Sequence, residues 1–359
     1  MDNYYRRPLP EGLIAFASPE GRALFREALA AGGMEGWFPL AETFHTQSEP
    51  PFCALGSLVV VLNALAMDPG RTWKGPWRWY SEELLDCCDS LATVREKGMS
   101  LPRFACLARC NGLAAAVRYG DEASVQQLEA DIVAAASGGP HVIVSFGRSA
   151  LGQTGDGHYS PIGGWHAGRR LALVMDVARF KYPPFWVPVE QLHAASATLD
   201  PATGRARGWI VLDRDGSVDA RVWRFQCETP GWRDALDALQ TAIPATLAAA
   251  RPQTARALVE ALTTLPAAAL ALVTPRDGDH ADVHAALRAC PLYDPVATHP
   301  DADRLVLLAL VAPDEALAEV QPSVREELTR LREGLAPLAR AEVERLRAQL
   351  SALRDILPG

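Results

Sequence analysis

The sequence predicts an α+β fold arranged in two domains. The chain has 359 residues, which is enough for two domains at about 150 residues each. Patterns typical of helices come first along the chain and patterns typical of strands follow, which is the order expected of an α+β domain. All nine tryptophans lie at or before Trp232, and the remainder is rich in alanine, leucine and arginine. We therefore expect one domain over residues 1–220 and a second, mostly α-helical domain over residues 221–359.

Five helices are expected in the first domain, because apolar residues recur there at three- and four-residue steps. The predicted helices span residues 19–31, 53–66, 81–91, 100–110 and 123–137. Strands are expected after them, where β-branched and aromatic residues form short runs such as HVIVSFG. The predicted strands span residues 141–147, 171–177, 208–212 and 221–225.

The second domain is expected to contain helices and one strand. Its predicted helices span residues 233–249, 254–263 and 324–335, and the strand spans residues 305–311. Near the C-terminus leucines recur at three- and four-residue steps with arginines between them, which predicts an amphipathic helix packed on the rest of the domain. These leucines are Leu346, Leu350, Leu353 and Leu357.

Charge and composition exclude several classes of protein. Asp and Glu (43) outnumber Lys and Arg (35), and the resulting net charge of −8 argues against a nucleic acid partner. The apolar runs fall well below the roughly 18 residues of a membrane span, and residues 1–22 hold no signal-peptide run, so we expect a cytoplasmic protein without a membrane partner. Seven cysteines without a CxxC motif argue against a disulfide framework and a structural zinc site, and no metal ligand is assigned.

Cys53 is the first candidate for chemistry. It follows Pro50 and Pro51 and precedes a long apolar run, so we expect it at the start of a helix. At that position the helix dipole and the unpaired backbone N–H groups favour the thiolate, which is the form a nucleophile needs. Gln47 lies shortly before it, and its side-chain N–H could join the Cys53 backbone N–H in an oxyanion hole.

A cysteine nucleophile also needs a base and a group that orients the base. His158 follows a glycine-rich loop at the start of an expected strand, and Asp176 ends the next one. Adjacent antiparallel strands could bring these two side chains together. Taken alone, each of these residues is more often structural, but the order Cys, His, Asp after a Gln favours nucleophilic catalysis.

The segments that carry these residues resemble the phytochelatin synthase family, which belongs to the papain-like cysteine peptidase clan. The matching segments cover most of residues 10–215 and are FASPEGRALFREAL, TQSEPPFCALGSLVVVLNAL, DPGRTWKGPWRWYSEELLDCC, QTGDGHYSPIGGW and DVARFKYPPFWVPV. The resemblance implies a papain-like catalytic domain, with a helical lobe and an antiparallel sheet lobe, followed by the C-terminal domain of the family.

The resemblance also implies a role for each site residue. Cys53 would attack glutathione, while His158 moves the proton and Asp176 orients the imidazole. Gln47 would stabilise the oxyanion. The implied substrate contacts are Asp200 and Arg207 for the γ-glutamyl group, Arg148 and Lys181 for the second glutathione, and also Arg179 and Tyr182.

The activity implied by the resemblance is that of a glutathione γ-glutamylcysteinyltransferase, which releases glycine and builds phytochelatins that chelate heavy metals. Its partners would be glutathione and the glutathione thiolates of cadmium, zinc or copper, no cofactor would be bound covalently, and the protein could form a homodimer. One alternative is a hydrolase that produces γ-glutamylcysteine and glycine, because Phe52 stands where plant members often have Tyr. The other is a thiol- or metal-binding module with a vestigial triad, although the C-terminal domain has only Cys227 and Cys290.

Overall fold

The structure is a computed structural model, and it describes residues 6–86, 88–215, 223–225, 241–271, 273–275, 281–314 and 316–356. The chain divides into two compact units, one of residues 1–85 with 91–214 and one of residues 86–90 with 215–359. The predicted domain boundary at residue 220 lies outside the described residues. Within the described ranges, no helix combines the length and the apolar character needed to cross a membrane.

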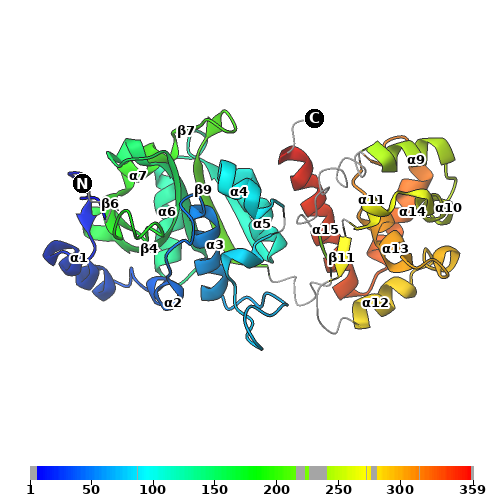
Figure 1. The fold of residues 1–359 in the computed structure, drawn as a ribbon, viewed down its shortest axis with the longest axis horizontal. Helices are drawn as coiled ribbons and strands as arrows, with labels where there is room; N and C mark the ends of the chain where they lie inside the picture. The colour runs from blue at the N-terminus through cyan, green and yellow to red at the C-terminus, as the bar shows by residue number, and fades with distance from the viewer. Residues whose placement is uncertain are drawn as a thin grey trace. The chain divides into compact units, whose positions relative to one another are not determined.

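A seven-stranded antiparallel sheet forms the centre of the first unit (Figure 1). Its strand order is β1-β6-β5-β4-β3-β9-β2, so that β3, β4 and β5 lie side by side in the middle. The strands are β1 Ile14–Ala15, β2 Leu113–Tyr119, β3 His141–Gly147, β4 Gly157–His166, β5 Leu171–Val174, β6 Phe185–Pro188 and β9 Gly208–Arg214. A separate short hairpin pairs β7, Leu199–Asp200, with β8, Arg205–Ala206.

Helices cover both faces of this sheet. They are α1 Pro19–Ala30, α2 Trp37–Thr43, α3 Cys53–Ala64, α4 Leu91–Lys97, α5 Leu101–Cys110, α6 Val125–Ala136 and α7 Val189–Ser196. Side chains alternate along β5, so that Ala172 and Val174 join a hydrophobic cluster with α6 and α7. Leu171 and Leu173 point the other way and join a cluster with α1. Because successive side chains of a strand point to opposite faces, α1 lies on one face of the sheet and α6 and α7 lie on the other.

The α+β prediction is confirmed, and most predicted elements of this unit are found within a few residues. Helices α1, α3, α5 and α6 and strands β3, β5 and β9 all have predicted counterparts. The helix predicted over residues 81–91 is wrong, because the described part of that segment holds only the 3-10 turn η1, Glu82–Leu84. Cys88 adopts a φ of 69°, a left-handed conformation that an α-helix excludes.

Strand β2 has no predicted counterpart. Its sequence LAAAVRY is rich in alanine, which is depleted in strands and gives no clear period of two. It nevertheless pairs with β9 over its whole length, from Leu113 opposite Arg214 to Tyr119 opposite Gly208. Pairing with a neighbouring strand therefore outweighs the local preference of these residues.

The second unit is mostly helical among its described residues (Figure 1). Its helices are α9 Ile243–Ala250, α10 Ala255–Ala261, α11 Ala267–Ala271, α12 Ala281–Arg288, α13 Ala302–Val311, α14 Pro322–Glu333 and α15 Pro337–Ile356. β10, Trp223–Phe225, pairs with β11, Val273–Pro275. The predicted helix over 233–249 lies partly outside the described residues, and its described end belongs to α9.

The strand predicted over residues 305–311 is wrong, because these residues lie in α13. Every residue from Leu305 to Val311 is buried, and a short run that is apolar on all sides cannot be assigned to helix or strand by its period.

Arg332 of α14 binds the end of α13, donating from Nε to the carbonyl of Leu310 at 2.7 Å and from Nη2 to that of Ala312 at 3.1 Å. Burial lowers the pKa of Arg332 to about 10.

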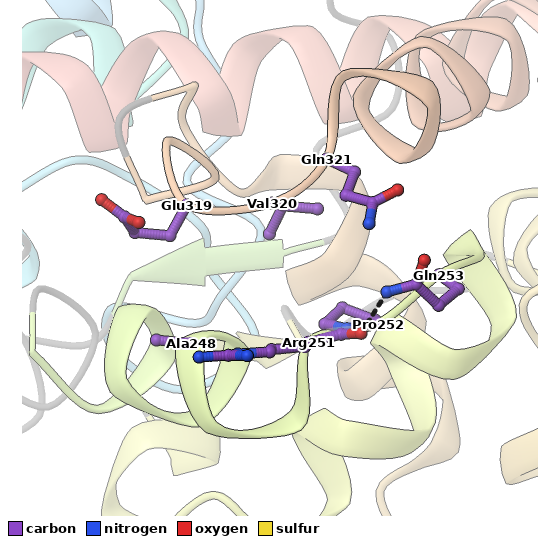
Figure 2. A pocket seen from close by; sticks show the side chains of 7 residues that line it. All are labelled: Ala248, Arg251, Pro252, Gln253, Glu319, Val320 and Gln321. Atoms are coloured by element: carbon purple, nitrogen blue, oxygen red, sulfur yellow. Dashed lines mark hydrogen bonds between the residues drawn. The ribbon is translucent and has the colours of Figure 1, made fainter.

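A polar pocket lies where the end of α9 meets the chain before α14 (Figure 2). Its lining residues are Ala248, Arg251, Pro252, Gln253, Glu319, Val320 and Gln321. Gln253 Nε2 donates to the carbonyl of Arg251 at 2.9 Å. The lining has no Cys, His, Ser or Thr, and its one acidic side chain is that of Glu319.

Asn63, near the end of α3, provides a test of the packing in the first unit. Its side chain donates to the carbonyl of Tyr80 at 3.0 Å and accepts the Tyr80 backbone N–H at 3.1 Å. We expect Asn63→Ala to lower the free energy of unfolding by about 2–4 kcal/mol, because both bonds are buried and each lost partner costs about 1–3 kcal/mol.

Urea denaturation followed by tryptophan fluorescence measures this loss, since most tryptophans lie in this unit. Gln126→Ala, on the exposed side of α6, is the matched control and should change stability by no more than about 0.5 kcal/mol. A loss no larger than that of the control would contradict the assignment.

Candidate active site

Cys53 is the first residue of α3, as predicted. The helix runs through the interior, and every residue from Ala54 to Asn63 is buried. Phe52 precedes the helix without a side-chain cap, so the dipole and the first backbone N–H groups act on whatever lies at its N-terminus. Cys53 is a free thiol and remains partly exposed, which leaves it accessible to a substrate.

His158 and Asp176 are placed by β4 and β5, two adjacent strands in the central part of the sheet. His158 lies in β4 opposite Phe146 of β3, and Asp176 lies shortly after the end of β5. His158 Nε2 is 2.9 Å from Asp176 Oδ1, with the two side chains 4% and 0% exposed. The Phe146 ring meets the imidazole edge-on, with ring centres 5.5 Å apart. The sheet thus brings together the two residues that were expected to meet.

Cys53 and His158 each shift the pKa of the other. Burial by itself would raise the pKa of the Cys53 thiol, but the hydrogen bond and charge of His158, together with the Tyr159 backbone N–H, lower it. Burial by itself would lower the pKa of His158, but the charge of Asp176 and the hydrogen bond with Cys53 raise it. The site therefore favours a thiolate beside an imidazolium, which is the reactive form of a cysteine nucleophile.

Arg148 binds the Asp176 carboxylate in a bidentate contact. Its Nη1 donates to Oδ2 at 2.9 Å and its Nη2 to Oδ1 at 3.0 Å, while the Ala178 backbone N–H donates to Oδ1 at 2.9 Å. Burial by itself would raise the pKa of Asp176, but His158 and Arg148 together lower it, so the carboxylate stays ionised. Arg148 is 3% exposed. Its contact with a second glutathione stays a prediction, whereas its contact with Asp176 is in the structure.

Asp200 and Arg207 lie together beside the β7–β8 hairpin. Arg207 Nη1 is 3.9 Å from Asp200 Oδ1, and Nη2 is 3.3 Å from Asp156 Oδ1. The side chain of Arg207 is 6% exposed, and its Nε is buried without a hydrogen-bond partner in the described part of the chain. A buried N–H of this kind is a donor for an anionic ligand. Gly157 makes room for it, because a Cβ there would come within 2.2 Å of Arg207 Nη1.

Tyr159 and Phe104 belong to the site but were not predicted. The pKa of the Tyr159 phenol is raised by burial and by the charges of Cys53 and Asp200, against the opposing charge of Arg207. The Tyr159 backbone N–H also donates to the Cys53 thiol, so Tyr159 lies at the nucleophile. Phe104 of α5 stacks on the Tyr159 ring at a centroid distance of 5.3 Å and an angle of 4°. Tyr159 adjoins His158 in the sequence, but nothing in the pattern of α5 indicates that Phe104 would reach it.

Gln47 is buried in the loop that leads to Cys53. Its backbone N–H donates to the carbonyl of Val177 at 3.1 Å, next to Asp176. Its side-chain Nε2 donates to the carbonyls of Glu49 and Pro50 at 2.8 and 2.7 Å. The structure therefore places the amide among the carbonyls of its own loop, and its donation to an oxyanion stays a prediction.

Three further predicted contacts follow Asp176 along the chain. The Arg179 guanidinium lies over the Phe44 ring at 5.1 Å. Tyr182 is buried, with the Arg148 guanidinium 5.2 Å and Lys181 Nζ 6.0 Å from its ring centre. Burial, together with the charge of Arg148, lowers the pKa of Lys181. Lys181 and Tyr182 thus lie around Arg148, whereas Arg179 turns toward Phe44.

The described residues contain no group of three or more His, Cys, Asp and Glu side chains suited to a metal ion. Apart from Cys53, the cysteines that the structure describes are buried, and these are Cys88, Cys106, Cys110 and Cys290.

Cys53 should react as a thiolate at lower pH than an ordinary thiol. A lowered pKa keeps the thiolate populated until the pH falls through that pKa, so we expect iodoacetamide to alkylate Cys53 with a pH midpoint below that of free glutathione measured in parallel. His158→Ala should move the midpoint upward, because it removes the hydrogen bond and the charge that favour the thiolate.

Peptide mass spectrometry of the alkylated protein gives the rate at each cysteine separately. Cys290 is an internal control, because burial raises its pKa and it should stay unmodified at the same pH. A Cys53 midpoint equal to that of glutathione would show that the pair does not form.

The comparisons with known proteins agree with this geometry. A family model described as Phytochelatin synthase matches residues 4–209. The chain is 45% identical over 242 residues, 67% of this chain, to glutathione gamma-glutamylcysteinyltransferase 3 of Lotus japonicus, and it covers 50% of that protein.

Two further relatives carry the same name. The chain is 48% identical over 231 residues to glutathione gamma-glutamylcysteinyltransferase 1 of Triticum aestivum, which is 64% of this chain and 46% of that protein. It is 42% identical over 212 residues to glutathione gamma-glutamylcysteinyltransferase of Schizosaccharomyces pombe, which is 59% of this chain and 51% of the relative. The chain thus spans about half the length of the curated relatives it matches. Because the family model covers more than half of the chain, including every candidate site residue, this protein belongs to the phytochelatin synthase family.

Proposed function

We propose that the protein is a glutathione γ-glutamylcysteinyltransferase, the activity named in its relatives. The observation that carries the proposal is the 2.9 Å contact of His158 with Asp176 next to Cys53 at the start of α3, together with the buried Arg207 donor beside Asp200. A general peptidase needs only the nucleophile and its base. A site selective for a γ-glutamyl group must also recognise a free ammonium and a free carboxylate at a distance from the bond that is cut.

Asp200 and Arg207 are the groups proposed for that recognition. The α-carboxylate of the γ-glutamyl group would accept hydrogen bonds from the Arg207 guanidinium, whose Nε is unpartnered. The ammonium of the same group would lie against Asp200, whose carboxylate is 3.9 Å from the guanidinium and 13% exposed. Because both groups are largely buried, water would compete weakly for the bound substrate.

In the first half of the reaction, Cys53 Sγ would attack the carbonyl carbon of the Cys–Gly peptide bond. A tetrahedral intermediate forms, and Gln47 would stabilise its oxyanion. The C–N bond then breaks, and His158 gives its proton to the departing nitrogen, so that glycine leaves with a neutral amine. The product on the enzyme is a γ-glutamylcysteinyl thioester of Cys53, with His158 neutral and still held by Asp176.

In the second half, the α-amino group of another glutathione would attack the thioester. His158 takes the proton from that amine, the C–S bond breaks, and Cys53 leaves as a thiolate. The result is one new γ-glutamylcysteine unit and a regenerated site. Arg148 and Lys181 are the proposed contacts for this anionic second substrate, and Arg179 and Tyr182 are proposed to lie in the same cleft. The Arg148 guanidinium and Lys181 Nζ are 5.2 and 6.0 Å from the Tyr182 ring centre.

Metal ions enter this proposal as part of the substrate. Cadmium, zinc and copper bind thiolates tightly, so a metal–glutathione complex would act as the second substrate. A homodimer and a cytoplasmic location remain proposals that follow from the family resemblance and the composition.

A hydrolase is the second candidate, and Phe52 is the observation in its favour. Phe52 adjoins the nucleophile, is buried, and has the Arg95 guanidinium 5.6 Å from its ring centre. Its ring presents no hydroxyl to an incoming amine, where plant members often have Tyr. If water attacks the thioester instead of the amine, the products are γ-glutamylcysteine and glycine.

Mass spectrometry of protein incubated with glutathione, with and without cadmium, tests these candidates. We expect glycine release together with oligomers of γ-glutamylcysteine, and Cys53→Ala should abolish both because no thioester can form. Glycine and γ-glutamylcysteine alone would indicate the hydrolase. Turnover of Cys53→Ala near the wild-type rate would overturn the mechanism, and Cys290→Ala is the control for loss of an unrelated thiol.

Arg207→Ala should lower kcat/KM for glycine release about 10- to 100-fold, because a charge-assisted bond to the substrate carboxylate contributes about 1.5–3 kcal/mol. Arg205→Ala is the matched control. Arg205 is two positions away, its side chain is 51% exposed, and it pairs with Glu122 at 2.8 Å on the surface. Equal kcat/KM values for the two variants would remove Arg207 from the site.

A further inference from the structure

Glu82 is a buried carboxylate that the mechanism does not use. It begins the 3-10 turn η1 and is 6% exposed. A buried carboxylate is costly unless polar groups surround it, so its partners indicate what it holds. The described partners of the Glu82 carboxylate all lie in one short segment, residues 45–48, which precedes Cys53.

The contacts between Glu82 and this segment are direct. The Ser48 backbone N–H donates to both carboxylate oxygens, at 3.2 and 3.0 Å, and the Ser48 hydroxyl donates to Oε2. His45 Nε2 lies 3.7 Å from Oε1. The contacts with Ser48 join positions 34 residues apart in the sequence, so they fix the segment from outside.

Gln47 lies between the two contacted residues. On the other side of the segment, the Gln47 backbone N–H is bound by the carbonyl of Val177. The segment is thus held at Ser48 by Glu82 and at Gln47 by the residue that follows Asp176. These two points fix the main chain at Gln47 and Ser48, and the carbonyls of Glu49 and Pro50 hold the Gln47 amide within the same loop.

Gly56 shows how closely these parts pack. A Cβ added at Gly56 would come within 3.0 Å of Glu82 Oε1 and within 3.2 Å of Gln47 Cβ. Both side chains therefore lie against the first turn of α3, which begins with Cys53. Glu82 has a fixed position of its own, because the preceding Tyr80 is held by both ends of the Asn63 side-chain amide.

We propose that Glu82 is a positioning residue that acts through Ser48 and holds the Gln47 segment against the first turn of α3, from which the Gln47 amide would reach the oxyanion. Glu82 does not touch the substrate, and it does not act on the thiolate. The proposal rests on the proposed function, which assigns Gln47 to the oxyanion. It separates two properties of the site: Glu82 supports the stabilisation of the tetrahedral intermediate, whereas His158 supports the nucleophile.

The test is a double-mutant cycle of Glu82→Gln and Gln47→Ala, with glycine release from glutathione as the readout. A Gln side chain at position 82 keeps the shape but replaces one acceptor oxygen by an NH2 donor that faces the Ser48 N–H. We expect Glu82→Gln to lower kcat about 10- to 100-fold, within the range seen for loss of an oxyanion donor, with KM changed less than about threefold. In the Gln47→Ala background the same change should lower kcat less than about twofold further.

A second readout distinguishes positioning from general damage. Alkylation of Cys53 by iodoacetamide has no oxyanion, so Glu82→Gln should keep the wild-type alkylation rate while glycine release falls. Ser48→Ala keeps the backbone contact and removes only the hydroxyl, so it should lower kcat by a smaller factor than Glu82→Gln. Glu83→Gln, on the adjacent exposed carboxylate, is the matched control and should leave both rates unchanged.

Three outcomes would overturn the proposal. They are a wild-type kcat in Glu82→Gln, effects of Glu82→Gln and Gln47→Ala that multiply, and an equal loss of alkylation and turnover. Absence of glycine release from the wild-type protein would instead contradict the proposed function. The two failures are therefore distinguishable in one set of measurements.

Discussion

The site depends on a single buried charge, the carboxylate of Asp176, which is 0% exposed. An ion in this position is stable only when charges and hydrogen-bond donors surround it, and breaking such a pair costs about 3–5 kcal/mol because the partner stays buried. The surrounding groups are the Arg148 fork, the His158 imidazole and the Ala178 backbone N–H. The hydrogen bonds and ion pairs of the Asp176 carboxylate therefore fix three parts of the chain relative to one another: the segment after β3, the start of β4 and the end of β5.

The other parts of the site are attached to the same strands. Ser57 of α3 donates to the carbonyl of Tyr159 at 3.0 Å, which ties the helix of the nucleophile to the residue after His158. Val177, next to Asp176, accepts the backbone N–H of Gln47. Cys53, His158 and the loop of Gln47 are thus all tied to one sheet, and rigid support of this kind is what a preorganised site requires. Arg207 makes none of these contacts, and its Nε–H has no hydrogen-bond partner in the described part of the chain.

Some features of the protein were determined by residues close together in the sequence. The repeat of apolar residues in α1, α3, α5 and α6 and the β-branched run of β3 are local, so the fold class and these elements could be predicted. The position of Cys53 at a helix start was equally local, since two prolines end what precedes it and a long apolar run follows. The order of Cys53, His158 and Asp176 then indicated the chemistry before any distance was known.

Other features were decided only by the tertiary structure, because they depend on groups that meet across long stretches of chain. The run of residues 305–311 is apolar on all sides, so its period could not distinguish a helix from a strand, and the left-handed Cys88 interrupts the helix expected over 81–91. The contact of Arg148 with Asp176 joins positions 28 residues apart, and that of Ser48 with Glu82 joins positions 34 apart. No local pattern encodes such pairs. The sequence by itself indicated the candidate chemistry, and packing decided which buried charges hold the candidate site in place.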